Sequence, residues 1–271
     1  MRKYPRPIPM IPDIPRFNVL GVSVSAMDLR IAVAAILAAA RERRKGYICV
    51  TGVHGITEAQ SDPEFRRILN ASFLNTTDGM PLVWLGRHYV KPEVQRVYGP
   101  DLMLALFAAT QAVPFRHFFY GGAPGVAEKL RASLEARFPG VQVVGTYTPP
   151  FRPLDAEENA ALTAQVSACQ PDLMWIGLST PKQERFMAEY LPQLDVTLMA
   201  GVGAAFDFHS GRVKQAPVWM QRSGLEWCYR LCSEPRRLGR RYLVNNPLFA
   251  WRIAQQLLGL RQYPLEGPQP A

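Results

Sequence analysis

The stretch SFLNTTDGMPLVW, residues 72–84, carries the pattern that decides the fold of this chain. Residues 72–76 predict a short strand, and residues 79–88 predict a helix. Asp78 therefore stands where a strand ends and a helix begins. An Asp before a Gly at such a junction is most often a helix cap or a turn residue, and this is the first interpretation of Asp78. The second interpretation is that its carboxylate performs chemistry at the edge of a sheet.

The alternation of strands and helices continues on both sides of this stretch. Residues 18–25 predict a short hairpin, and Asp28 is placed to cap a helix that runs to about Arg44. This alternation predicts an α/β fold, with a Rossmann-like, mostly parallel sheet and helices on both of its faces. The remaining strands are predicted at residues 47–51, 115–122, 141–147, 172–179 and 196–203.

The composition divides the chain into four segments. Residues 1–16 predict a proline-rich extended tail, and residues 17–211 predict the α/β domain. Residues 212–260 predict a helical appendage, because the strand pattern stops near residue 211. Residues 261–271 predict a disordered tail.

The appendage is strongly basic, and its predicted helices are interrupted at Gly224, Pro235 and Pro247. The whole chain has a formal net charge of +9. Between Arg212 and Arg261, ten Lys or Arg residues against two Glu give +8 in that region alone. Such a block indicates an anionic partner: phosphate, nucleic acid or anionic lipid. Apolar residues alternate with the arginines, as is typical of a helix on an anionic membrane surface. They are Leu243, Leu248, Phe249, Trp251 and Leu257.

Localisation follows from composition. No apolar run reaches the roughly 18–20 residues that span a bilayer, and the prolines near the start exclude the apolar core of a secretory signal. The four cysteines form no CxxC pair, although Cys228 and Cys232 are spaced to share a helix face. Free thiols are the preferred interpretation, and they indicate a reducing cytoplasm.

Candidate site residues follow the predicted strands. In an open parallel sheet, ligands bind beyond the carboxyl ends of the strands, so these residues converge on one edge. Glycine pairs there allow close approach of a ligand to the backbone, and the helix N-termini that follow favour phosphate. The candidates are Thr51, Asp78, Gly121, Gly122, Tyr147, Ser179, Lys182, Gln183, Gly203 and Asp207.

Several familiar types of binding and catalytic site are excluded, because the sequence lacks their motifs. The chain has no GxGxxG with a following acidic residue, no GxxxxGK[ST] loop, no GxSxG elbow and no HExxH. Its four histidines lack metal-ligand spacing, so no metal or other cofactor is expected. Gln183, in the first turn of a helix, would ordinarily be solvated. Asp207 between two phenylalanines is more unusual, because burying a carboxylate alone is costly.

Five stretches together resemble the WecG/TagA/CpsF bacterial glycosyltransferases, glycosyltransferase family 26. They are TTDGMPLVW, RVYGPDLM, FYGGAPGVAEKL, GLSTPKQERF and the run from GVGAAFDF to RRLGRRY. Each is weak alone, but their order over residues 18–250 is highly specific. The resemblance implies sugar transfer from a UDP-sugar to a polyprenyl-diphosphate-linked saccharide at the inner face of the cytoplasmic membrane. It further implies inversion at the anomeric carbon without a metal ion.

The resemblance also implies roles for individual residues. Asp78 matches the catalytic base that deprotonates the acceptor hydroxyl, and Thr51 lies near a matching threonine of the site. Gln183 and Asp207 match positions that hold the uridine end of the donor. Three appendage arginines match positions that complete the site against the diphosphate. They are Arg230, Arg237 and Arg240.

One departure concerns the run TGVHG after the strand at residues 47–51. The family commonly has an asparagine directly after the threonine. In this chain Gly52 replaces that asparagine, or the local alignment with the family is shifted by one residue. In the second case His54 is a candidate for the space that the asparagine fills.

Two other function classes are alternatives. A nucleic-acid-binding α/β protein would explain the charge, but it would interleave basic and aromatic residues across a platform, so no nucleic-acid partner is expected. A non-catalytic UDP-sugar sensor would keep Gln183 and Asp207 without needing Asp78. The transferred sugar stays open among N-acetylmannosamine, its uronic acid and glucose. The acceptor saccharide and the oligomeric state are equally open, with a homo-oligomer among the alternatives.

Overall fold

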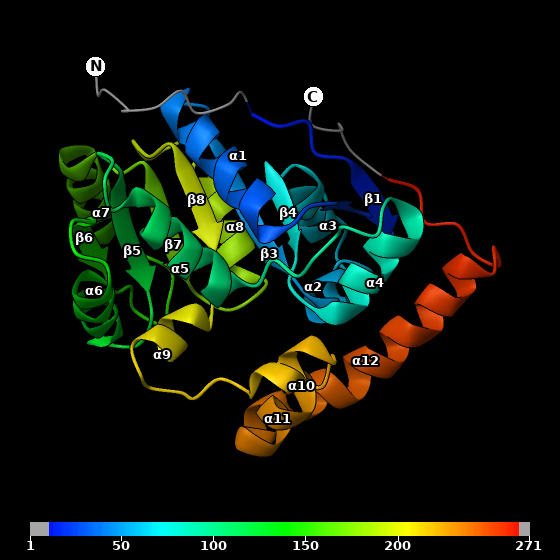
Figure 1. Ribbon diagram of the computed structural model, residues 1–271. Coiled ribbons are helices and arrows are strands. Elements are labelled where there is room, and N and C mark those ends of the chain that lie inside the picture. The colour runs from blue at the N-terminus through cyan, green and yellow to red at the C-terminus, as the bar shows by residue number, and fades with distance from the viewer. Residues whose placement is uncertain (1–10, 266–271) are drawn as a thin grey trace. The chain divides into compact units, whose positions relative to one another are not determined.

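The computed structural model describes residues 11–265 of the chain. Its central element is a six-stranded parallel sheet with the strand order β4-β3-β8-β7-β5-β6. A two-stranded antiparallel hairpin, β1–β2, forms a separate sheet. Helices flank the large sheet, with α1 and α5 on one face and α8 on the other (Figure 1). The α/β prediction is therefore confirmed.

The elements lie close to their predicted positions. The strands are β1 (Arg16–Val19), β2 (Val22–Ser25), β3 (Gly46–Thr51), β4 (Leu74–Thr77), β5 (Arg116–Gly121), β6 (Gln142–Tyr147), β7 (Leu173–Gly177) and β8 (Leu198–Gly201). The first helices are α1 (Leu29–Arg41), α2 (Val53–Glu58), α3 (Pro63–Asn70), α4 (Met80–Tyr89), α5 (Gly99–Thr110) and α6 (Val126–Arg137). The remaining helices are α7 (Ala156–Cys169), α8 (Lys182–Tyr190), α9 (Ala205–His209), α10 (Val218–Arg222), α11 (Glu226–Ser233) and α12 (Pro235–Leu257).

The chain forms two compact units. Unit 1 contains residues 29–49 and 99–213, and therefore most of the large sheet. Unit 2 contains residues 14–28, 50–98 and the chain from 214 onward. The helices α10–α12 thus belong to the same unit as the hairpin, the end of β3 and helices α2–α4.

Unit 1 has a buried aromatic core on β5 and β7. His117 and Trp175 are fully buried on these neighbouring strands. The indole Nε1 of Trp175 donates to His117 Nδ1 at 3.1 Å. The other ring nitrogen, Nε2, lies 2.9 Å from the hydroxyl of Thr110 at the end of α5. Because the indole can only donate, the imidazole is neutral with its hydrogen on Nε2, and both ring nitrogens are satisfied.

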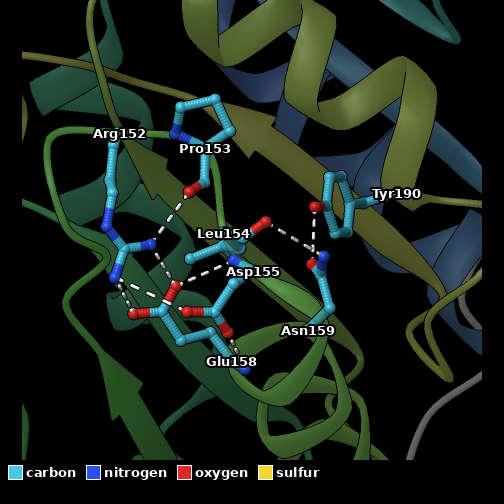
Figure 2. A network of polar contacts seen from close by, with 7 residues as sticks. All are labelled: Arg152, Pro153, Leu154, Asp155, Glu158, Asn159 and Tyr190. Atoms are coloured by element: carbon cyan, nitrogen blue, oxygen red, sulfur yellow. Dashed lines mark hydrogen bonds and ion pairs between the residues drawn. The ribbon is translucent and has the colours of Figure 1, made fainter.

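Helix α7 begins with a complete capping box. The Asp155 carboxylate accepts from Glu158 N, and the Glu158 carboxylate accepts from Asp155 N, each at 2.9 Å. Arg152 donates from Nη1 and Nη2 to the two carboxylate oxygens of the same Glu158, at 2.7 and 2.9 Å (Figure 2). Asn159 receives a hydrogen bond from the hydroxyl of Tyr190 at 2.7 Å, which ties α7 to α8. Such a box satisfies helix-end donors and contributes about 1 kcal/mol.

Unit 2 joins the N-terminal hairpin to the end of α12. Gln256 accepts from Leu20 N at 2.8 Å and donates to Asn18 O at 2.9 Å. Asn18 donates to Tyr263 O at 2.6 Å. Leu20 and Gly21 both have positive φ, which gives the tight two-residue loop expected of a hairpin. Residues 261–265, part of the predicted tail, therefore lie against the hairpin, whereas residues 266–271 lie outside the described chain.

The prediction that Pro247 interrupts a helix is wrong. Helix α12 runs unbroken past it. A proline removes one helical hydrogen bond and frees the carbonyl four residues earlier, that of Leu243. Both Pro247 and Leu243 are exposed, so water can satisfy this carbonyl.

The buried histidine makes the stability of unit 1 sensitive to acid. Burial lowers the pKa of His117 from 6.5 to about 3. Between these values the unfolded chain binds a proton that the folded chain does not, so stability falls as the pH falls. The loss attributable to His117 is about 1.4 kcal/mol per pH unit.

Chemical denaturation of the wild type and His117→Gln at a series of pH values tests this. The variant should be less stable at neutral pH, and its deficit should shrink as the pH is lowered below 6.5. A deficit that stays constant over that range would show that the imidazole does not titrate with folding.

Candidate functional site

The backbone of Asp78 joins the ends of β4 and β3. Its N–H donates to Thr51 O at 3.1 Å. The N-cap position of α4 belongs to Gly79, so Asp78 is not the N-cap residue of that helix. Its half-buried carboxylate lies one residue before this N-cap, directly after the end of β4.

The strand ends place Thr51 and Gly52 beside this carboxylate. A Cβ atom on Gly52 would lie 3.3 Å from Asp78 Oδ2, so the glycine leaves room for the acid. The hydroxyl of Thr51 is buried and has no hydrogen-bond partner among the described residues. A buried hydroxyl in that state needs a ligand or a water molecule. A side chain at position 52 would lie directly against the Asp78 carboxylate.

A largely buried cation, Arg96, organises this region of unit 2. Its Nε donates to Asp78 O at 2.5 Å, and its Nη2 is paired with Glu226 on α11. Its guanidinium also lies 3.8 Å above the ring of Tyr98. The Tyr98 hydroxyl donates to the second Glu226 oxygen at 2.7 Å. Arg96 thus ties the residue that carries the acid to the start of α11.

The ionisable side chains around Asp78, called the Asp78 cluster below, shift the pKa values of one another. Burial disfavours the charge on Arg96, but Asp78 and Glu226 outweigh it and raise the pKa of the guanidinium. Burial and the nearby Glu226 and Asp78 carboxylates raise the pKa of Tyr98 well above its ordinary range, so its hydroxyl stays protonated. Burial also opposes the charge on Arg230, yet Tyr242, Tyr98, Glu226 and Asp78 raise the pKa of that side chain. Arg230 is therefore a permanent cation within electrostatic range of Asp78.

Helix α12 contributes an amide to the same unit. Asn245 Nδ2 lies 2.8 Å from His54 Nδ1 on α2, and the two helices pack together. His54 was the alternative to Gly52 for the space of the family's asparagine. Its imidazole instead contacts Asn245 of the appendage. Arg240 of α12 is exposed, and the side chain of Arg237 lies outside the described part of the structure. Of the three appendage arginines, Arg230 is the one that the described residues place in the cluster.

Unit 1 holds the second group of candidate residues, at the start of α8. Gln183 and Glu184 are almost fully buried there. Gln183 Nε2 donates to Glu184 Oε1 at 3.0 Å, and Thr180 donates to the same oxygen at 2.9 Å. The amide oxygen of Gln183 is buried without a hydrogen-bond partner among the described residues. The interpretation of Gln183 as a solvated side chain is therefore wrong.

Glycines shape the space around this amide. A Cβ atom on Gly201 would lie 3.0 Å from Gln183 Nε2, and one on Gly203 would lie 3.4 Å from Gln183 Oε1. Gly203 also has a φ of 49°, which disfavours a side chain there. Asp207, on α9, is partly exposed and pairs with Arg212 at 3.4 Å. Its carboxylate is thus paired at the surface rather than buried alone.

Most of the other sheet-edge candidates have structural partners. Gly121 and Gly122 have positive φ, and a Cβ atom on Gly121 would lie 2.8 Å from the backbone of Gly177. The pair therefore permits close packing of β5 on β7, which is a sufficient reason for glycine there. The Tyr147 ring stacks on Tyr120 at a centroid distance of 5.7 Å. Lys182 is exposed at the start of α8.

Sequence reasoning missed several members of these clusters. Arg96 and Tyr98 lie in the quoted motif RVYGPDLM, and Glu184 lies in GLSTPKQERF, so a signal was present. Glu226 also lies in a quoted run, the one that ends at RRLGRRY, whereas Asn245 lies outside all five stretches. The partners of both residues are more than 100 residues away, so the pairings themselves had no local signal. All four cysteines are free thiols. Across residues 11–265, no group of three or more His, Cys, Asp or Glu side chains is arranged to hold a metal ion.

Comparison with known proteins agrees with the resemblance seen in the sequence. Residues 17–263 match the family described as "Glycosyl transferase WecG/TagA/CpsF family". One relative is the N-acetylglucosaminyldiphosphoundecaprenol N-acetyl-beta-D-mannosaminyltransferase of Bacillus spizizenii. It is 30% identical over 200 residues, which cover 73% of this chain and 76% of the relative. The chain thus belongs to the WecG/TagA/CpsF family of glycosyl transferases, and it is an enzyme.

Proposed function

We propose that this enzyme transfers N-acetylmannosamine from its UDP-sugar to a polyprenyl-diphosphate-linked N-acetylglucosamine, with inversion at the anomeric carbon. The name of the Bacillus spizizenii relative supports the choice of sugar and acceptor. The observation that carries the mechanism is the position of Asp78. Asp78 lies just before the N-cap residue of α4, its carboxylate adjoins Gly52, and two partly buried cations, Arg96 and Arg230, lie within its electrostatic range.

Asp78 acts as the general base of this reaction. Its carboxylate accepts the proton of the acceptor hydroxyl while the hydroxyl oxygen forms a bond to the anomeric carbon of the donor. The bond from that carbon to the UDP oxygen breaks, and UDP departs with its electron pair. Attack from the face opposite to UDP inverts the configuration at the anomeric carbon.

Two arginines have separate roles in this proposal. Arg230 stabilises the negative charge that develops on the departing diphosphate through charge-assisted hydrogen bonds. Arg96 already uses its donors on Asp78 O and Glu226, so it positions the base rather than binding substrate. In this scheme guanidinium groups supply the positive charge, and no step requires a metal ion.

Gln183 supplies the nucleotide contact in unit 1. Uracil presents both a donor and acceptors on its edge, and the buried amide oxygen of Gln183 can accept from that donor. Glu184 and Thr180 hold the amide in one orientation. Asp207 is a weaker candidate, because Arg212 already pairs with its carboxylate.

The outer face of α12 supports binding to a membrane surface. Leu238, Phe249 and Ile253 are buried on one side of this helix. The opposite side exposes large apolar side chains, where a helix in water would present polar ones. They are Leu243, Val244 and Trp251, and Leu258, the residue directly after the helix, is exposed as well. Phe249 was expected on the membrane face and instead packs inward, while Leu243 and Trp251 are exposed as predicted. Among the described residues no helix is long and apolar enough to cross a bilayer.

Replacing Asp78 with asparagine tests the general base. Asp78→Asn keeps the shape but cannot accept the proton, so turnover should fall by about 10²- to 10⁴-fold. The assay uses UDP-N-acetylmannosamine and a short-chain polyprenyl-diphosphate N-acetylglucosamine. Asp62→Asn is the matched control, because asparagine caps α3 as well as aspartate does. Near-normal turnover of Asp78→Asn would remove the catalytic assignment.

Calorimetry with UDP tests the nucleotide contact. Gln183→Ala should weaken UDP binding by roughly 1–3 kcal/mol, because a ligand hydrogen bond is lost in a buried place. Gln193→Ala, at an exposed position just after α8, serves as the control and should bind UDP normally. Equal affinity of both variants for UDP would exclude the proposed uridine contact.

A further inference from the structure

A cavity of about 180 Å³ lies at the C-terminal end of α12, within unit 2. None of the residues assigned above to catalysis or nucleotide binding lines it. Three arginines do line it: Arg66 from α3, Arg252 from α12 and Arg261 from the segment after α12. No Asp or Glu occurs among the described lining residues.

The cavity walls come from distant parts of the chain and are fixed by specific contacts. The hairpin loop forms one wall, where a Cβ atom on Gly21 would lie 3.2 Å from Pro264 O and 3.5 Å from Arg66 Cδ. Asn18 and Gln256 fasten this loop to the chain around α12. Arg261 lies 5.1 Å from the centre of the Tyr263 ring, which orients its guanidinium. The cavity is therefore preformed, which lowers the entropic cost of binding a ligand.

The lining chemistry favours a phosphate group. Three cations around one small space repel one another, and an anion relieves this repulsion. Guanidinium groups match phosphate oxygens with paired donors.

The size and surroundings of the cavity indicate the source of the phosphate. Pockets for drug-sized ligands measure about 300–1,000 Å³, so this one suits a headgroup rather than a nucleotide sugar. Arg252 directly follows Trp251, which is 64% exposed. Arg261 directly follows Leu260, which is 74% exposed. Apolar side chains that can enter a lipid layer thus adjoin the cations that would meet its phosphates.

We infer that this cavity binds the phosphate of an anionic phospholipid headgroup and fixes the end of α12 on the membrane surface. The inference rests on the membrane association in the proposed function, and it is independent of the sugar and the acceptor.

Co-sedimentation with vesicles of phosphatidylcholine and phosphatidylglycerol tests it, using the full-length protein. The variant Arg252→Gln/Arg261→Gln should bind these vesicles about 25-fold more weakly, since each basic residue near an anionic surface contributes roughly fivefold. The charge-matched control, Arg222→Gln/Arg236→Gln, removes two exposed arginines of the appendage outside the cavity. It should lose clearly less, because its altered residues do not line the cavity. Equal losses in the two variants would overturn the inference, because diffuse charge would then account for the binding.

Two further measurements distinguish phosphate recognition in the cavity from attraction by charge alone. Arg252→Lys/Arg261→Lys keeps the charge but loses the paired donors, so it should restore binding only in part. Full restoration would contradict recognition of a phosphate by the cavity. In calorimetry, glycerol phosphate should bind weakly to the wild type and not to the glutamine variant. Absence of binding to the wild type would also contradict phosphate recognition by the cavity.

Turnover of a water-soluble acceptor distinguishes this inference from the proposed function. The glutamine variant should keep wild-type turnover, because its altered residues lie outside the Asp78 cluster. Absence of vesicle binding by the wild type, with that turnover intact, would overturn the headgroup site and leave the reaction standing. Absence of any turnover by the wild type, with headgroup binding intact, would instead overturn the proposed reaction.

Discussion

The largely buried ion pair between Arg96 and Glu226 is the interaction on which the candidate catalytic region depends. It joins the β4–α4 junction to α11, and the side chains of both partners are less than one-fifth exposed. Breaking such a pair costs about 3–5 kcal/mol, because a charge would remain buried without compensation. The pair is also connected to Tyr98, Gln221 and the Asp78 carbonyl. The position of the acid therefore depends on the appendage as well as on the sheet.

The same appendage combines two surfaces. The inward side of α12 holds apolar anchors and Asn245, which reaches His54 on α2. Its outward side presents Trp251 and other apolar groups to the solvent. If this outward side lies on lipid, the helix that contacts the membrane is also the helix that packs against α2 within unit 2. Membrane binding and support of the candidate site would then involve one element.

The fold could be predicted from the sequence because its strands and helices alternate regularly, and the structure reproduces each of them. The junction at Asp78 could be predicted in part. Its position at the end of a strand followed from pattern, but the cap and catalytic interpretations differ only in where the side chain lies. The structure gives the N-cap position of α4 to Gly79 and not to Asp78. Pro247 shows a limit of local rules, since an exposed face allows a helix to continue through proline.

The remaining site features could not be predicted because they depend on distant contacts. Nothing in the local sequence shows that Glu226 pairs with Arg96, 130 residues away. Because Gln183 lies in the first turn of a helix, the sequence predicts that its side chain is solvated. The glycines of β8 and of the turn after β8 instead leave room for the side chain to be buried. The cavity at the end of α12 likewise brings together residues from three separate segments. Only the folded chain places these groups side by side.

The central claim is that Asp78 removes the proton and that the Arg96–Glu226 pair positions it. A double-mutant cycle in turnover number tests both parts together. Glu226→Gln alone should slow turnover by about tenfold, yet it should add little to the loss already caused by Asp78→Asn, because residues that act as a unit are not additive. Multiplication of the two losses in the double variant would contradict the account, since the pair would then act independently of the base.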